Sequence, residues 1–219
     1  MPHMNDAANA LHDAHPRVLL VGAGGIGSNL LSLASAGLRT GTTSLTVMDG
    51  DLIEDRNLPH QRFTERDVGR AKAEVLEERF STPFLQVAGR IENLRTPEQL
   101  EGYDLIIVAV DRPEPRRLVH ASDVPWIDLR STGRGTLVLT HLDDPRRIVE
   151  QTPDHAPASC QAEGVLERGY VQFGFALAAT IGAQWLVDHV VHGNSPTTAF
   201  MVDAAYGGFR FSPLPEVSA

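Results

Sequence analysis

The stretch VLLVGAGGIGSNLLSLASAG at residues 18–37 constrains the fold of this chain more than any other. An apolar run ends in glycines, and beyond Gly27 leucines and alanines recur at helical spacing. We therefore expect a buried strand, a tight turn and a helix, with Ser28 placed to cap the helix. Gly22, Gly24 and Gly27 form the pattern G-x-G-x-x-G, which lets backbone N–H groups and a helix N-terminus approach phosphate oxygens.

Strand-like and helix-like segments alternate along the rest of the chain. We predict strands at 43–51, 84–91, 103–111, 125–130 and 135–142, helices at Asp67–Phe80 and Val165–His189, and a closing hairpin at 198–216. Such alternation is typical of a mostly parallel sheet with helices on both faces, and ligands bind such sheets at the carboxyl ends of the strands. The expected fold is one doubly wound α/β domain with antiparallel strands at its C-terminal end.

The 219 residues are enough for one domain with a substantial core. Residues 1–16 are polar and alanine-rich, and we expect a flexible segment there. The domain is expected at 17–212, followed by a tail at 213–219. Residues 142–159 are polar, interrupted by prolines and without a period, which predicts a mobile crossover loop.

Composition limits the classes of partner and compartment. The net charge of −9 argues against general binding to nucleic acid or to anionic membranes. The single cysteine, Cys160, excludes an intrachain disulfide and a cysteine-rich zinc site. Because no apolar run approaches the ~20 residues of a membrane span and the first residues include acids, we expect a cytoplasmic protein without a membrane partner.

Asp49 ends the second predicted strand, where a carboxylate can accept hydrogen bonds from ribose hydroxyls. The turn and this acid alone are also compatible with an NAD(P)-dependent oxidoreductase. A dehydrogenase has no need of Asn57, Gln61 and Lys72, which follow closely. A triphosphate requires such cationic and polar groups, and a leaving pyrophosphate requires further positive charge or a metal ion.

Four segments together, GAGGIGS, DGDLIEDRNLPHQ, DVGRAK and VDRPEPRR, resemble the motifs of the ThiF/MoeB superfamily. This group of HesA/MoeB/ThiF type includes ubiquitin-activating enzymes and the adenylating enzymes of sulfur-carrier proteins. The segments beginning SCQAEGVL and FMVDAAYG resemble later parts of the family, so the resemblance runs from Arg17 to Phe211. It implies a Rossmann-like domain that uses ATP and Mg²⁺ to adenylate a C-terminal carboxylate.

The resemblance also implies roles for individual residues. Asp49 would hold the ribose, Asn57 and Lys72 the phosphates and ribose, and Asp111 a magnesium ion beside the α-phosphate. Cys160 lies where sulfur-carrier activators have a cysteine that can bind the activated carrier, so Asp111, Lys72 and Cys160 are the candidate catalytic residues. The whole candidate nucleotide set is Gly22, Gly24, Gly25, Gly27, Asp49, Asp51, Asn57, His60, Gln61, Arg62 and Lys72.

The chain departs from the family pattern at several positions. His60 stands where the family has an arginine, and Arg62 or Arg56 could supply that charge. The paired zinc cysteines of many relatives are missing, so we expect no zinc. Simpler roles remain open, since Cys160 could be an inert buried thiol and Lys72 a member of an ion-paired helix face.

The implied partner is a ubiquitin-like or sulfur-carrier protein, or a peptide, with a free C-terminal carboxylate. Because the family dimerises, we expect a homodimer. Two alternatives remain: a degenerate subunit that pairs with an active homologue, and the NAD(P)-dependent oxidoreductase. The acidic balance makes a tRNA substrate the less favoured choice.

Overall fold

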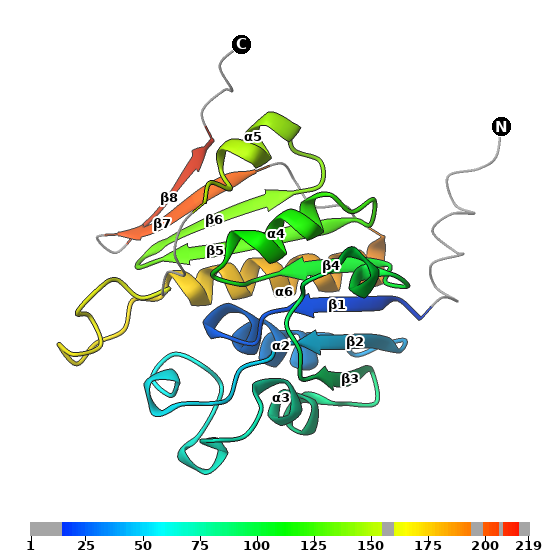
Figure 1. Ribbon diagram of the computed structural model, residues 1–219, viewed down its shortest axis with the longest axis horizontal. Helices are drawn as coiled ribbons and strands as arrows, with labels where there is room; N and C mark the ends of the chain where they lie inside the picture. Colours follow the sequence, from blue (N-terminus) through cyan, green and yellow to red (C-terminus); the bar gives the residue numbers. More distant parts are fainter. Residues whose placement is uncertain (1–14, 155–159, 194–198, 206–207, 215–219) are drawn as a thin grey trace.

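An eight-stranded sheet crosses the molecule in the computed structural model, with the strand order β3-β2-β1-β4-β5-β6-β7-β8 (Figure 1). The structure describes residues 15–154, 160–193, 199–205 and 208–214. The parallel strands are β1 (Arg17–Val21), β2 (Thr43–Met48), β3 (Leu85–Arg90), β4 (Leu105–Val108) and β5 (Trp126–Thr132). The antiparallel strands are β6 (Gly135–Thr140), β7 (Phe200–Ala205) and β8 (Gly208–Pro213). The predicted fold class is confirmed.

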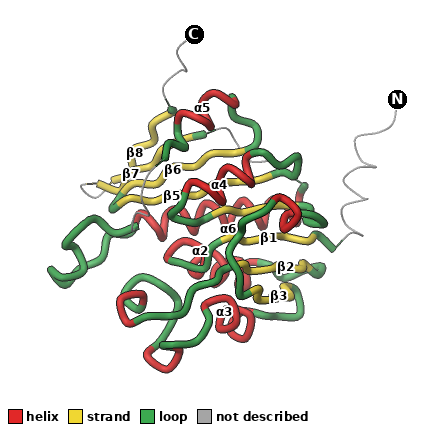
Figure 2. The backbone as a smooth tube through the Cα atoms, viewed as in Figure 1, coloured by secondary structure: helices red, strands yellow, loops and turns green. Residues whose placement is uncertain are grey.

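Helices cover both faces of this sheet, as a doubly wound fold requires (Figures 1 and 2). One face carries α2 (Gly25–Gly37), α3 (Lys72–Phe80) and α6 (Gly174–His192). The other carries α4 (Pro113–His120), α5 (Pro145–Glu150) and the 3₁₀ turn Pro97–Leu100. Each face has its own apolar cluster, because the central strands are apolar on both sides.

The strand order reverses direction at β1. From β1 the chain continues to β2 and β3 on one side, and it then returns to β4 and β5 on the other. Val21, at the end of β1, pairs with Met48 in β2 and with Val108 in β4. Ligands of open α/β sheets bind in the crevice at such a reversal, so the loops after β1, β2 and β4 are the expected site.

Two predicted helices begin later than expected. The helix predicted from Asp67 begins at Lys72, because residues 65–67 form a separate 3₁₀ turn and Gly69 has a φ of +85°. The helix predicted from Val165 begins at Gly174, since Gly169 (φ +80°) interrupts the chain and residues 163–169 form turns. Hydrophobic spacing alone does not register such breaks.

The other side of the sheet carries two helices that the sequence analysis missed. The segment 142–159, predicted as a mobile loop, contains α5, whose N-cap residue Asp144 accepts a hydrogen bond from the backbone N–H of Arg146 at 2.8 Å. Residues 155–159 of that loop lie outside the described part. Pro113 and Pro115 obscure α4 in the sequence, although proline is well tolerated in the first turn of a helix.

Among the described helices, α6 is long and apolar enough to cross a membrane by length and composition alone. Its most apolar 18-residue window is 44% buried inside the molecule. Because α6 packs against α2, β5 and β6, the same composition suits a core helix, and the criterion is weak evidence for a membrane span.

Candidate functional site

The glycine turn between β1 and α2 lies at the reversal point and is packed tightly at two positions. Gly22 has a φ of +101°, and a Cβ atom there would lie 2.6 Å from the carbonyl oxygen of Ala109. A Cβ atom on Gly27 would lie 1.9 Å from the carbonyl oxygen of Gly22. By contrast, a Cβ atom on Gly24 would meet no heavy atom within 4 Å. The turn therefore presents its open side at Gly24.

The N-terminus of α2, which carries the partial positive charge of the helix dipole, lies at this open side. Its N-cap residue is Gly24, and no side chain caps it. Ser28 does not cap the helix as we predicted, because it already lies in the first turn, where its hydroxyl donates to the carbonyl of Gly24 at 2.7 Å. Uncapped N–H groups and the helix dipole both favour an anion.

Asp49 ties the glycine turn to the loop after β2. One carboxylate oxygen accepts a hydrogen bond from the N–H of Ala23 at 2.7 Å, and the other accepts one from Asp51 at 2.9 Å. The side chain is buried, and this burial raises the pKa of Asp49, while the nearby ammonium group of Lys72 opposes the shift. Asp49 thus lies beside the glycine turn and is hydrogen-bonded to it, and its role toward a ribose stays a prediction.

Lys72 is a buried cation in the same region. It begins α3, is 6% exposed, and its Nζ lies 3.0 Å from an Asp51 carboxylate oxygen. The side chain of Asp51 is 65% exposed, so the ion pair opens to solvent on the Asp51 side. Lys72 is thus buried and pairs with Asp51 of the preceding loop, so it does not belong to a solvated ion-paired face of α3, the simpler alternative.

His60 and Cys160 meet at Gly25. A Cβ atom on Gly25 would lie 3.1 Å from the Cys160 Sγ atom and 3.2 Å from the Cδ2 atom of His60. Burial, followed by the charge of Lys72, lowers the pKa of His60, so the imidazole is neutral at physiological pH. Burial raises the pKa of the Cys160 thiol. The pair is therefore a neutral ring and a protonated thiol.

Asn57, Gln61 and Arg62 lie on the loop that carries His60, whereas Asp111 follows β4. Asn57 accepts a hydrogen bond from the Glu54 N–H at 2.9 Å and so shapes a local turn. Gln61 lies beside His60, and the Arg62 backbone N–H donates to Ser28 at 3.1 Å. Asp111 is exposed just after β4, two residues beyond the carbonyl that contacts Gly22.

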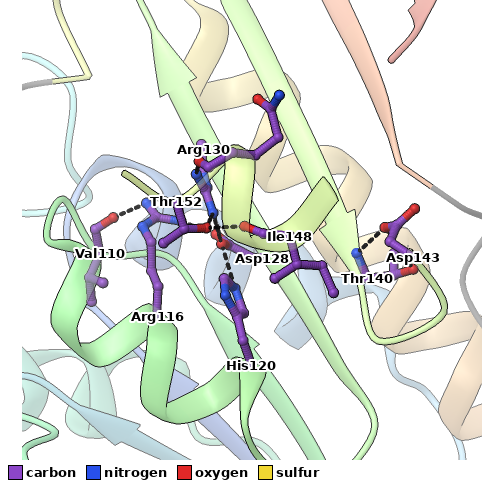
Figure 3. Close-up of polar contacts among 10 residues, drawn as sticks. Val110, Arg116, His120, Asp128, Arg130, Thr140, Asp143, Ile148 and Thr152 are labelled. Carbon is purple, nitrogen blue, oxygen red and sulfur yellow. Dashed lines mark hydrogen bonds and ion pairs between the residues drawn. The ribbon is translucent and has the colours of Figure 1, made fainter. Parts of the chain in front are cut away.

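A buried charged cluster that the sequence motifs did not reveal lies beside this site, on α4 and β5 (Figure 3). Its members are Arg116, His120, Asp128 and Arg130. Asp128 and Arg130 alternate with apolar residues in the segment WIDLR, which forms the buried part of β5. Charged residues in a buried strand are the signal that could have pointed to them.

A glycine turn at the strand reversal, followed by a buried acid after the next strand, defines the class of α/β domains that bind nucleotide phosphates. The chain belongs to the ThiF family, whose model matches residues 4–216. The resemblance found in the motifs is thereby confirmed.

Relatives fall within the same family. The chain is 31% identical over 109 residues to the NEDD8-activating enzyme E1 catalytic subunit of Saccharomyces cerevisiae, an alignment of 48% of this chain and 36% of that protein. It is 36% identical over 115 residues to the adenylyltransferase and sulfurtransferase uba4 of Aspergillus niger, covering 49% of this chain and 23% of that protein. The matches to these curated relatives thus span about a quarter to a third of their length.

Solved structures show the same fold. The crystal structure of E. coli MccB with ATP superposes with a TM-score of 0.67 at 18% sequence identity. The superposition covers 94% of this chain and 65% of the MccB chain. At this level of identity the likeness concerns the fold.

Proposed function

We propose that this chain is an ATP-dependent adenylyltransferase that activates the C-terminal carboxylate of a small ubiquitin-like or sulfur-carrier protein, or of a peptide. The carrying observation is the open face of the turn at Gly24, at the uncapped N-terminus of α2. The buried cation of Lys72 acts on Asp49, which is hydrogen-bonded to the same turn. The family relationship, the names of the curated relatives and the MccB structure with ATP support the same activity.

The groups around the turn fit the phosphates of ATP. Backbone N–H groups at the start of α2 and the ammonium group of Lys72 offset the charge of the polyphosphate. We assign Asp111 to Mg²⁺, which prefers carboxylate oxygens and completes its shell with phosphate and water. A substrate carboxylate oxygen would attack the α-phosphorus, the bond to the bridging oxygen of pyrophosphate would break, and an acyl-adenylate would remain.

Asp49 keeps the capacity to bind ribose. Each of its oxygens accepts one backbone hydrogen bond, and an ionised carboxylate oxygen can accept two. Ribose hydroxyls would therefore find acceptors on a carboxylate that the Ala23 and Asp51 N–H groups already orient. Asn57, Gln61 and Arg62 are proposed to complete the nucleotide site from the loop that carries His60.

Cys160 is proposed as an acceptor in a second step. It would take the acyl group and form a thioester, or take sulfane sulfur from the persulfide group of an external donor, whose thiol would be the leaving group. In a thioester, the Sγ–C bond would form as the acyl–oxygen bond to AMP breaks, and the thiol would lose its proton. Its raised pKa means that a base must assist at neutral pH. The acyl-adenylate must form first, since this step consumes it.

One observation favours a second candidate function. The family arginine is replaced by His60, whose lowered pKa leaves the phosphate site without that charge. A degenerate subunit that pairs with an active homologue would tolerate this loss. We propose a homodimer for the active adenylyltransferase and a pair with an active homologue for the degenerate subunit. We propose the cytoplasm as the location in either case.

Calorimetric titration tests the nucleotide site without knowledge of the acyl substrate. We expect saturable binding of Mg-ATP, and Asp111→Ala to lose it, while Asp123→Ala, an exposed acid near the opposite end of β5, binds like the wild type. Wild type that binds neither ATP nor NAD(P) would favour the degenerate subunit. Binding of NAD or NADP alone would exclude the adenylyltransferase.

A further inference from the structure

The charged cluster beside the nucleotide site is organised around the carboxylate of Asp128 (Figure 3). Asp128 is fully buried, and one of its oxygens is bound by Arg116. The other oxygen lies 3.0 Å from His120 Nε2 and 2.6 Å from a terminal nitrogen of Arg130. The Arg130 Nε atom adds a second hydrogen bond at 3.0 Å. One carboxylate thus fixes two guanidinium groups and an imidazole.

Each guanidinium group also holds a different loop. Arg116 donates to the carbonyl of Val110, the residue immediately before Asp111. Arg130 donates to the carbonyl of Gln151 and, at 2.9 Å, to the hydroxyl of Thr152. Asp128 therefore connects the peptide that carries Asp111 with the segment after α5, two loops that are far apart in the sequence.

Stability gives little reason for this arrangement. Buried ion pairs cost about as much in desolvation as they return, and apolar side chains of similar volume often replace them without loss. Burial lowers the pKa of His120 to about 3, and its ring therefore contributes no positive charge at neutral pH. What the cluster does supply is a rigid, directional link, because a guanidinium fork accepts few alternative geometries.

We propose that Arg116, Asp128 and Arg130 are positioning residues that couple Asp111 to the segment Gln151–Asp154. When Asp111 binds Mg-ATP, the Val110–Asp111 peptide becomes fixed. The segment after α5 then becomes more ordered as well, because both are held by the same network of Arg116, Asp128 and Arg130. That segment begins the connection that leads to Cys160. The proposal rests on the proposed function in assigning Asp111 to the nucleotide site.

The charges of the cluster allow each arm to be cut separately. We call the hydrogen bonds from Arg116 to Val110, and those from Arg130 to Gln151 and Thr152, the two arms of the cluster. The cluster contains two arginines and one aspartate, so Arg116→Met removes the arm to Val110 and leaves the ion pair between Arg130 and Asp128. Arg130→Lys keeps the charge but loses the fork that binds Asp128 and Thr152. Arg146→Gln is the control, because Arg146 lies on α5 itself and makes an exposed ion pair with Asp144.

Hydrogen–deuterium exchange of the full chain, measured in peptides that cover residues 145–154, tests the coupling with and without Mg-ATP. The amides of Ile148, Gln151 and Thr152 are hydrogen-bonded there and report the order of the segment. Without nucleotide, we expect Arg116→Met to accelerate this exchange about fivefold or more, although Arg116 touches none of these residues. Saturating Mg-ATP should slow the exchange in the wild type and Arg146→Gln, but not in Arg116→Met or Arg130→Lys.

Two results would overturn the proposal. One is exchange at 145–154 that is unchanged in Arg116→Met, which would mean that the two arms are independent anchors. The other is equal slowing by Mg-ATP in Arg130→Lys and the wild type. If the wild type binds no Mg-ATP, the proposed function fails separately, and the nucleotide-free comparison of Arg116→Met still decides the coupling. Should Arg116→Met not fold, Arg130→Lys and a parallel Arg116→Lys carry the same comparison.

Discussion

At the scale of single residues, two glycines of the turn are expected to serve different purposes: Gly27 is needed for folding and Gly24 for binding. Gly24 has a φ of −75°, which any residue adopts, and a methyl group there would meet no protein atom within 4 Å. We expect Gly24→Ala to keep the wild-type melting temperature but to weaken Mg-ATP binding about tenfold or more, because its methyl occupies the space where phosphate approaches.

Gly27→Ala is the matched variant, in which the methyl group would collide with the carbonyl of Gly22. Such a contact requires the backbone to move, so we expect a loss of several kcal/mol in the free energy of unfolding. Thermal melting and calorimetry on both variants check the contrast. A Gly24→Ala protein that binds Mg-ATP normally would place the phosphates elsewhere.

The acid stability of the protein should depend on His120. Its pKa is about 3 in the folded protein, against an ordinary value of 6.5, mainly because of burial and then because of Arg130 and Arg116. As the pH falls below ~6.5 toward 3, the unfolded chain binds a proton at His120 that the folded chain does not, so the free energy of unfolding decreases. This stability is fully present above pH ~6.5.

The variant His120→Gln removes that proton while keeping an N–H donor for Asp128. Between about pH 7 and pH 4.5, we expect urea denaturation to show a loss of stability that is about 2–3 kcal/mol smaller in His120→Gln than in the wild type. Equal pH dependence in the two proteins would show that His120 titrates normally. His60, whose pKa is also lowered, remains in both and contributes equally.

Residue-level prediction worked where one residue type answers one physical need. Gly22 and Gly27 could be selected from the G-x-G-x-x-G spacing, because a tight turn between a strand and a helix leaves no room for a side chain at either position. Lys72 was selected as a cation for a triphosphate, and the structure shows it to be buried. The resemblance gave Cys160 a chemical role but no position, and its place beside Gly25 is known only from the structure. The partners of Asp128 could not be found, because they come from α4, β5 and the segment after α5, which only tertiary packing brings together.

At the scale of elements, the apolar strands were predictable because burial on both faces demands continuous hydrophobic runs. Helix ends were not, since they depend on local caps and on positive-φ glycines such as Gly69 and Gly169. The helix α5 is too short and polar to show a period. Its Asp144 cap, and the packing of Ile148 against the apolar cluster on that face of the sheet, emerge only in three dimensions.

The packing of α6 against α2 and β5 depends on Gly182. A Cβ atom there would lie 2.4 Å from Leu129 Cδ1 and 2.6 Å from Leu30 Cδ1, and both leucines are fully buried. We expect Gly182→Ala to cost about 1–3 kcal/mol of unfolding free energy by overpacking, despite the better helix propensity of alanine. Thermal denaturation beside Thr180→Ala, an exposed position of the same helix, is the measurement. If Gly182→Ala is as stable as the wild type, Leu30 and Leu129 repack around the added methyl group at no cost.

At the scale of the whole molecule, α6 is a core helix that keeps apolar surface only partly covered by the rest of the described chain. Its most apolar window is 44% buried, although the helix covers β5 and β6 and packs on α2. The remaining apolar surface is half-covered, at positions such as Leu177 and Ile181. Burying this stripe against a second copy would remove it from water, which is the main driving force for association.

Light scattering during size-exclusion chromatography tests this homodimer. For a chain of 23.8 kDa we expect a particle of twice that mass, and Leu177→Glu should shift it toward the monomer, because a charge in a desolvated apolar contact is costly. Val149→Glu is the control, since Val149 is exposed on α5, on the opposite face of the sheet. Wild type that elutes as a monomer would favour a heterologous partner for α6, and dissociation by both variants would place the interface elsewhere than on this helix.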